Sequence, residues 1–92
     1  MIDSFRHKGL RRFFEDDDGS KLPAEMLPRI RLILTALEAA QAVEGMNNPL
    51  FRLHPLRGNL RGYWAVTVRA NWRIVFRFEG GKAHDIDFVD YH

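Results

Sequence analysis

The sequence contains no cysteine, so disulfide bonds and metal sites built from thiolates are excluded. No apolar run approaches the roughly 18 residues that cross a membrane, and the first residues lack the apolar segment of a secretion signal. Internal repeats, low-complexity segments and a phosphate-binding glycine loop are also missing. These absences favour a soluble cytoplasmic protein over a secreted, membrane-bound or P-loop protein.

The 92 residues suit one domain, which we expect to span residues 1–92. Hydrophobic residues make up 46% of the chain, well above the composition of disordered chains, so a small core is expected. The net charge of +2 is unevenly distributed. Residues 52–82 contain a single acid, Glu79, and seven basic residues: Arg52, Arg57, Arg61, Arg69, Arg73, Arg77 and Lys82. This predicts a basic surface, which either binds a phosphate-rich partner or keeps an exposed sheet face soluble.

Apolar residues in the first half of the chain recur at helical spacing. They predict a short helix over residues 8–15 and a second helix with apolar positions over residues 27–40. The second helix is expected to have a kink or a late start, because Pro28 inside a helix that began at Pro23 would delete a backbone donor. The stretch of residues 45–49 is expected to end it.

In the second half the apolar period changes to two, which predicts half-buried strands: one over residues 51–56, followed by two hairpins. One sheet face is apolar and needs the helices as its partner. The pattern therefore predicts an α+β fold, with two N-terminal helices packed on one face of a small, mainly antiparallel sheet. The predicted buried face carries Trp64, Val66, Val68, Trp72, Ile74, Phe76, Phe78, Ile86 and Phe88.

The register of both hairpins follows from the same pattern, because residues directly opposite on antiparallel strands share a face. Placing Ile74 opposite both Val66 and Phe88 favours three-residue loops over two-residue loops. We expect Asn71 and Gly81 to be the left-handed residues of these loops.

The other sheet face is expected to be open and polar, with Arg77 opposite Asp85 as an ion pair. By strict alternation the side chains at positions 90 and 92 point to the buried face. They can reach the open face only if the strand end frays or contains a bulge. Gathered on or beside the open face are six side chains: His54, Arg57, Arg73, Asp90, Tyr91 and His92.

This set suits RNA cleavage by attack of a 2′-hydroxyl on the adjacent phosphorus. The reaction needs a base, a cation for the phosphorane charge and an acid for the leaving 5′-oxygen. His54 and His92 can be the base and the acid in either order, and the two arginines fit phosphate binding. Asp90 can orient an imidazole, and Tyr91 can stack on a base or donate to phosphate. A zinc site built from the same histidines and Asp90 is less favoured, because no paired histidine spacing is present.

Five segments of the sequence occur together and in order: Phe5-x-His7-Lys8-Gly9-Leu10, Leu53-His54-Pro55-Leu56-x-Gly58, Gly62-x-Trp64, Asn71-Trp72-Arg73-Ile74-x-Phe76 and Asp90-Tyr91-His92. In this combination the chain resembles, over its whole length, the HigB-type toxins of the RelE/ParE superfamily. The His-Pro-Leu segment, the Asn-Trp-Arg-Ile strand and the Asp-Tyr-His ending are the most specific parts of the resemblance.

The resemblance implies a RelE-like microbial RNase fold and the toxin of a type II toxin–antitoxin pair. Such a toxin is an mRNA interferase that inhibits translation and growth by cutting mRNA in the ribosomal A site, with no metal or other cofactor. The resemblance also implies a helix-turn-helix antitoxin (HigA-like), and operator DNA bound only through the antitoxin complex. Arg73 is the implied phosphate-binding cation, and Arg57 stands where relatives often have lysine. The implied catalytic residues are His54, Asp90, Tyr91 and His92.

Two other functions remain open at the level of sequence. A ParE-like member of the same superfamily would inhibit DNA gyrase without cleaving RNA. A binding module would use the basic face on nucleic acid or on an acidic partner, with no catalysis.

Overall fold

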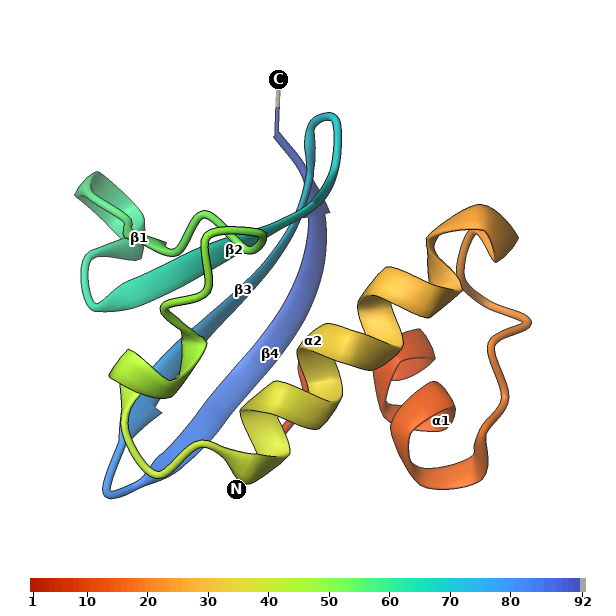
Figure 1. The fold of residues 1–92 in the computed structure, drawn as a ribbon, viewed down its shortest axis with the longest axis horizontal. Coiled ribbons are helices and arrows are strands. Elements are labelled where there is room, and N and C mark those ends of the chain that lie inside the picture. The colour runs from red at the N-terminus through yellow and green to blue at the C-terminus, as the bar shows by residue number, and fades with distance from the viewer. Residues whose placement is uncertain (92) are drawn as a thin grey trace.

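A computed structural model describes residues 1–91, and Figure 1 shows helices lying across one face of a sheet. The helices of this part of the chain are α1 (Lys8–Asp16), α2 (Leu27–Ala39) and the short 3-10 helices η1 (Ala24–Met26), η2 (Val43–Met46) and η3 (Gly58–Leu60). Its strands, in their order across one antiparallel sheet, are β1 (His54–Pro55), β2 (Tyr63–Arg69), β3 (Trp72–Glu79) and β4 (Lys82–Asp90). The predicted α+β fold is confirmed. None of the helices within residues 1–91 is long and apolar enough to span a membrane.

Helix α1 lies where the sequence predicts it. His7 caps its start, because the ring Nδ1 accepts a hydrogen bond from the backbone amide of Leu10 at 3.1 Å. Asp17 ends it with a left-handed backbone at φ 56°. Arg31 of α2 donates to the Asp17 carboxylate at 2.7 Å and lies 4.5 Å from the centre of the Phe13 ring, so these contacts join α1 to α2.

Helix α2 starts late, as predicted, with Pro28 in its first turn, where a missing backbone N–H costs nothing. Its predicted end is wrong. The helix stops well before Gly45, because Ala40 already has an extended backbone. The amino group of Met1 donates to the carbonyl oxygens of Leu37 and Ala40 at 3.3 and 2.8 Å. This contact satisfies acceptors at the helix end and puts a positive charge at the negative end of the helix dipole.

The strand predicted over residues 51–56 is paired only in β1. Arg52 has a left-handed backbone, with φ 51°, and this interrupts the extended conformation. Phe51 is nevertheless buried, and its carbonyl oxygen accepts a hydrogen bond from the amide of Thr67 at 2.7 Å. The segment is therefore attached to β2 on both sides of Arg52.

The predicted central register of both hairpins is confirmed, since Ile74 lies opposite Val66 on β2 and Phe88 on β4. The predicted three-residue loops are wrong. Each loop has two residues, and the pairs that close them are Arg69 with Trp72 and Glu79 with Lys82.

Each loop is one residue shorter than predicted, and a β-bulge in each hairpin takes up the extra residue, so the central register is kept. In the first hairpin the register shifts between Thr67 and Arg69, so the extra residue is Val68 on β2. In the second hairpin the shift leaves residues 85 and 86 of β4 facing the single residue Phe76 of β3. Asp85 in this bulge has φ 54°, the left-handed conformation that suits a bulge.

The left-handed loop residues differ from the prediction in one hairpin. In the first loop Ala70 has φ 50°, and Asn71 is not left-handed. In the second loop Gly81 has a positive φ of 77°, as predicted, and Gly80 also has a positive φ, of 58°. Two successive positive φ angles form a turn whose twist matches that of the flanking strands, which is why this loop needs only two residues.

The predicted buried face is confirmed. Of its nine residues, six are buried and the side chains of Trp64, Trp72 and Phe78 pack against them while staying partly exposed. The helices cover this face with Leu10, Phe13, Ile30, Ile33, Leu34 and Leu37.

The opposite face is less open than predicted. Val75 is buried there in a second small cluster with Ala65 and Leu56. Leu60 packs against the same cluster and belongs to η3, so the connection between β1 and β2 covers part of this face (Figure 1).

The N-terminal residues form a contact that the sequence pattern does not predict. Residues 2–5 run parallel to β4, with bridges from Ile2 to Ala83 and from Phe5 to Ile86. This pairing covers the β4 edge of the sheet, which would otherwise offer unpaired backbone groups to another chain.

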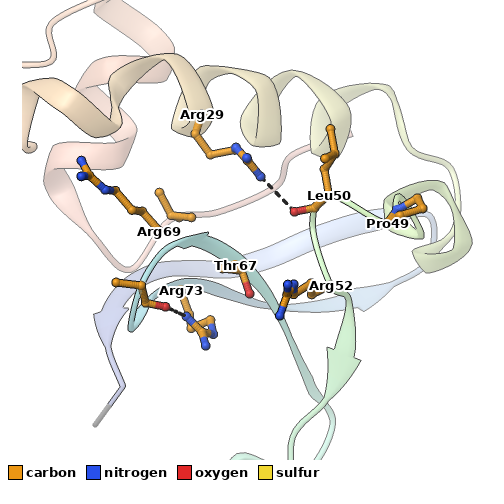
Figure 2. A pocket seen from close by; sticks show the side chains of 9 residues that line it. Arg29, Pro49, Leu50, Arg52, Thr67, Arg69 and Arg73 are labelled. Carbon is orange, nitrogen blue, oxygen red and sulfur yellow. Dashed lines mark hydrogen bonds between the residues drawn. The ribbon is translucent and has the colours of Figure 1, made fainter.

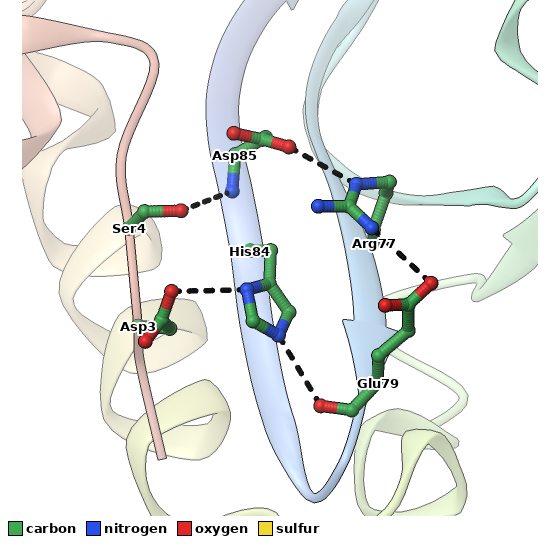
Figure 3. A network of polar contacts seen from close by, with 6 residues as sticks. All are labelled: Asp3, Ser4, Arg77, Glu79, His84 and Asp85. Atoms are coloured by element: carbon green, nitrogen blue, oxygen red, sulfur yellow. Dashed lines mark hydrogen bonds and ion pairs between the residues drawn. The ribbon is translucent and has the colours of Figure 1, made fainter.

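Side chains strengthen this edge, as Figure 3 shows. The Asp3 carboxylate lies 3.0 Å from Nδ1 of His84, and the hydroxyl of Ser4 accepts from the amide of Asp85 at 2.9 Å. The predicted ion pair is confirmed, because Nε of Arg77 donates to the Asp85 carboxylate at 3.0 Å. Its predicted position is wrong, because Arg77 lies opposite His84 and Asp85 lies in the bulge. The hydrogen bond to Asp85 is the main cause that raises the pKa of Arg77 above its usual value.

Candidate active site

His54 lies exposed on β1, where it pairs with Ala65. Its Nδ1 is 3.0 Å from the carbonyl oxygen of Arg52. Because a carbonyl oxygen only accepts, Nδ1 carries the hydrogen of this bond, and the acceptor lone pair of the neutral ring is on Nε2. The backbone of Arg52 thereby fixes the tautomer in which His54 can take a proton through Nε2.

Arg73 lies half-buried on β3, in a row with Thr67 of β2 and Val89 of β4. Its Nη1 donates to the carbonyl oxygens of Ala70 and Trp72 at 2.5 and 3.2 Å. A guanidinium has five N–H donors, so bonds from one nitrogen hold its position and leave further donors for an anion.

The end of β4 carries two of the remaining predicted residues. Tyr91 follows the strand, is 40% exposed, and its amide donates to the carbonyl oxygen of Asn71 at 2.8 Å. Asp90 is the last residue of β4 and is exposed, and its pairing with Trp72 puts it in a row of the helix-covered face. His92, the other terminal residue of the predicted site, lies outside the described residues.

The strand register puts His54 and Arg73 on one sheet face, as predicted, and Tyr91 directly follows the end of β4. His54 is two strands from Arg73 and three strands from Tyr91. Usual strand spacing and rise give roughly 12 Å between the Cα atoms of His54 and Arg73, and roughly 20 Å between those of His54 and Tyr91. The histidine and the tyrosine therefore flank the arginine across the face, and a substrate has room between them.

Arg57 lies exposed on the connection between β1 and β2, at the residue that precedes η3. It follows His54 closely in the chain, and its guanidinium is accessible to solvent. Its predicted role in phosphate binding stays a prediction.

A pocket of about 520 Å³ opens between α2 and the hairpin of β2 and β3 (Figure 2). Four arginines line it and none of its lining residues is acidic: Arg29, Arg52, Arg69 and Arg73. The sequence pattern includes Arg52 and Arg69 in its basic segment, but it gives no signal that α2 adds Arg29 to them. Arg73 belongs both to this pocket and to the predicted catalytic face.

The described residues 1–91 contain no group of three His, Cys, Asp or Glu side chains arranged to hold a metal ion. The less favoured zinc site includes His92, which lies outside that range, so the structure does not test it.

Comparisons with known proteins agree on one family. Residues 3–92 match the family model of HigB-like toxins, described as the RelE-like toxin of type II toxin-antitoxin system HigB. Endoribonuclease HigB of Proteus vulgaris is 46% identical over 92 residues, which is 100% of both chains. Toxin HigB-1 of Vibrio cholerae is 33% identical over 94 residues, covering 100% of this chain and 98% of that protein.

The fold also has solved counterparts. In the heterotetrameric complex of the YoeB–YefM toxin–antitoxin from Staphylococcus aureus, one chain superposes with a TM-score of 0.62 at 18% identity, covering 100% of this chain and 98% of that one. A likeness at this identity concerns the fold alone.

Proposed function

The chain belongs to the family of HigB-like toxins of type II toxin–antitoxin systems, and from this membership we propose that it is an endoribonuclease that cleaves mRNA in the ribosomal A site. Full-length identity of 46% to Endoribonuclease HigB supports the activity. The observation that carries the chemistry is the tautomer of His54, held by the Arg52 carbonyl on the sheet face of Arg73. Because mRNA and ribosomes are its targets, the cytoplasm is its site of action.

The proposed reaction needs no metal, because side chains provide each function. Nε2 of His54 takes the proton from the 2′-hydroxyl, whose oxygen attacks the adjacent phosphorus. The bond from phosphorus to the 5′-oxygen breaks, which leaves a 2′,3′-cyclic phosphate and a 5′-hydroxyl. Arg73 stabilises the added negative charge on the phosphorane oxygens. The terminal Asp90-Tyr91-His92 segment supplies the proton to the leaving 5′-oxygen, with His92 as the acid.

The proposed partner that silences the toxin is a helix-turn-helix antitoxin of the HigA type, and the pair binds operator DNA through the antitoxin. The family description as a toxin–antitoxin system supports this partner. The YoeB–YefM complex is an example of a toxin of similar fold bound to its antitoxin.

A deoxy substitution at the scissile nucleotide tests the reaction. Without the 2′-hydroxyl there is no nucleophile, so programmed ribosomes should retain intact mRNA at that site and still yield products at unsubstituted sites. Cleavage that continues at the substituted site would reject 2′-hydroxyl attack.

The variant H92A tests the role of the terminal segment. It should abolish growth inhibition and mRNA cleavage, while its thermal unfolding midpoint stays near that of the wild type. If the variant is as toxic as the wild type, a supercoiling assay with DNA gyrase then separates the ParE-like reading from simple binding.

A further inference from the structure

We propose that Arg29, Arg52 and Arg69 extend the site from Arg73 into a phosphate-binding track for the single-stranded RNA that leads away from the scissile bond. The track rests on the proposed endoribonuclease function, because Arg73 lies on the catalytic face and also lines the pocket. It adds three binding residues to those that the sequence resemblance assigns.

The first argument is electrostatic. Four guanidinium groups around a pocket of about 520 Å³ repel one another, and no acidic residue lines the pocket to compensate them. A fold that gathers charges of one sign in a concave site concentrates its field there and attracts polyanions. Arginine also suits phosphate better than lysine, because its planar fork binds two oxygens at once.

The second argument is that two of the arginines, Arg29 and Arg73, are held in place before any ligand binds. Nη1 of Arg29 donates to the carbonyl oxygen of Leu50 at 2.9 Å, and Arg73 is held by the carbonyl oxygen of Ala70 (Figure 2). Each bond uses one nitrogen and directs the group without neutralising its charge. A charged side chain that is already ordered loses less conformational entropy when it binds.

The third argument is backbone strain at the pocket. Two of the four described non-glycine residues with positive φ, Arg52 and Ala70, line it. Side-chain-bearing residues rarely adopt this conformation, and such strain gathers at binding sites. At Arg52 it serves two purposes, because the side chain lines the pocket while the carbonyl oxygen holds the ring of His54.

The rim of the pocket indicates a single strand rather than a duplex. Leu50 is 60% exposed and lies beside Pro49 at the same rim, which gives an apolar surface next to the arginines. A single strand can place an unstacked base on such a surface, whereas a duplex keeps its bases stacked inside. The four arginines come from α2, from the segment before β1 and from the hairpin of β2 and β3. They are more cations than one isolated phosphate group needs, which favours a ligand with several phosphates.

The test measures binding separately from cleavage. The probe is a fluorescent oligonucleotide of single-stranded RNA with 2′-deoxy sugars at its cleavable positions, titrated with the full chain by anisotropy over a range of salt concentrations. In R29Q/R69Q, loss of two phosphate contacts should reduce the slope of log Kd against log salt by about 1.4, because each contact contributes about 0.7. The same relation gives a loss of affinity of about 25-fold at 0.1 M salt.

Two control variants separate binding from general charge and from folding. R6Q makes the same chemical change at an exposed residue that does not line the pocket, and its affinity should stay within about twofold of the wild type, as for surface changes away from contacts. R29K/R69K keeps both charges and should retain most of the salt slope. In cleavage assays on programmed ribosomes, R29Q/R69Q should raise KM with little change in kcat.

The outcomes distinguish the track from the proposed function. If R29Q/R69Q binds RNA like the wild type while the wild type cleaves mRNA, the track is refuted and the function stands. If the double variant loses binding and the wild type cleaves nothing, the track stands and the endoribonuclease proposal fails. A duplex of the same sequence that competes as well as the single strand would also overturn the assignment to single-stranded RNA.

Discussion

Replacing His54 with alanine separates its chemical role from its structural one. A positioned general base contributes about 10²- to 10⁴-fold to a rate, which is about 3 to 5 kcal/mol in the activation free energy. The side chain is exposed, and its Nδ1 is hydrogen-bonded to the carbonyl oxygen of Arg52. Its loss should cost only about 0.5 kcal/mol of folding stability, or about 2 to 4 °C in the unfolding midpoint of a chain this small.

The assay is single-turnover cleavage on programmed ribosomes, measured across pH together with thermal unfolding. H54A should cleave about 10²- to 10⁴-fold more slowly than the wild type. The control is the variant H84Q. His84 lies on β4, at the opposite edge of the sheet, and contacts Asp3, so this variant should cleave normally but unfold at a lower temperature. Cleavage by H54A within tenfold of the wild type would refute the assignment of His54 as the base.

Three further predictions concern the fold that holds the site. F51A should lower the free energy of unfolding by about 3 to 5 kcal/mol in urea titrations, because the ring is buried and its removal leaves a cavity, whereas F51L should cost less than about 1.5 kcal/mol. G81A should lower the free energy of unfolding by about 1 kcal/mol, because alanine at φ 77° is strained. An unchanged urea midpoint would contradict the turn geometry. D85N should lower the unfolding midpoint by weakening the bond to Arg77, more at low salt than at high salt. Because the pKa of Arg77 is raised, the charge of its guanidinium is lost when the pH rises through a strongly alkaline range, and the difference between D85N and the wild type should be constant near neutrality.

The hairpins show what apolar alternation can and cannot predict. The pattern requires that Ile74 face Phe88, and this pairing is present. One extra residue is needed to achieve it, but the pattern does not say whether that residue lies in the loop or in a bulge. The structure puts it in the strand, near Asp85, because the two glycines make a two-residue turn favourable.

Apolar alternation also predicts only part of the candidate active site. Alternation predicts that His54, Arg73 and Tyr91 share a face, because this depends only on strand parity. The arginine pocket was not predictable, because it depends on where α2 lies over the sheet and on the left-handed backbone of Arg52. Neither property leaves a periodic signal in the sequence. The roles of Asp90 and His92 stay predictions.

The pairing of residues 2–5 with β4 affects the order in which the protein can fold during its synthesis. Asp3 and His84 are hydrogen-bonded although 81 positions separate them in the chain. A ribosome that adds about 5 to 20 amino acids per second needs roughly 4 to 16 seconds to make that intervening length. The earliest residues therefore remain without their final neighbours until almost the whole chain has been synthesised, so the outer edge of the sheet is the last part of the fold that can form.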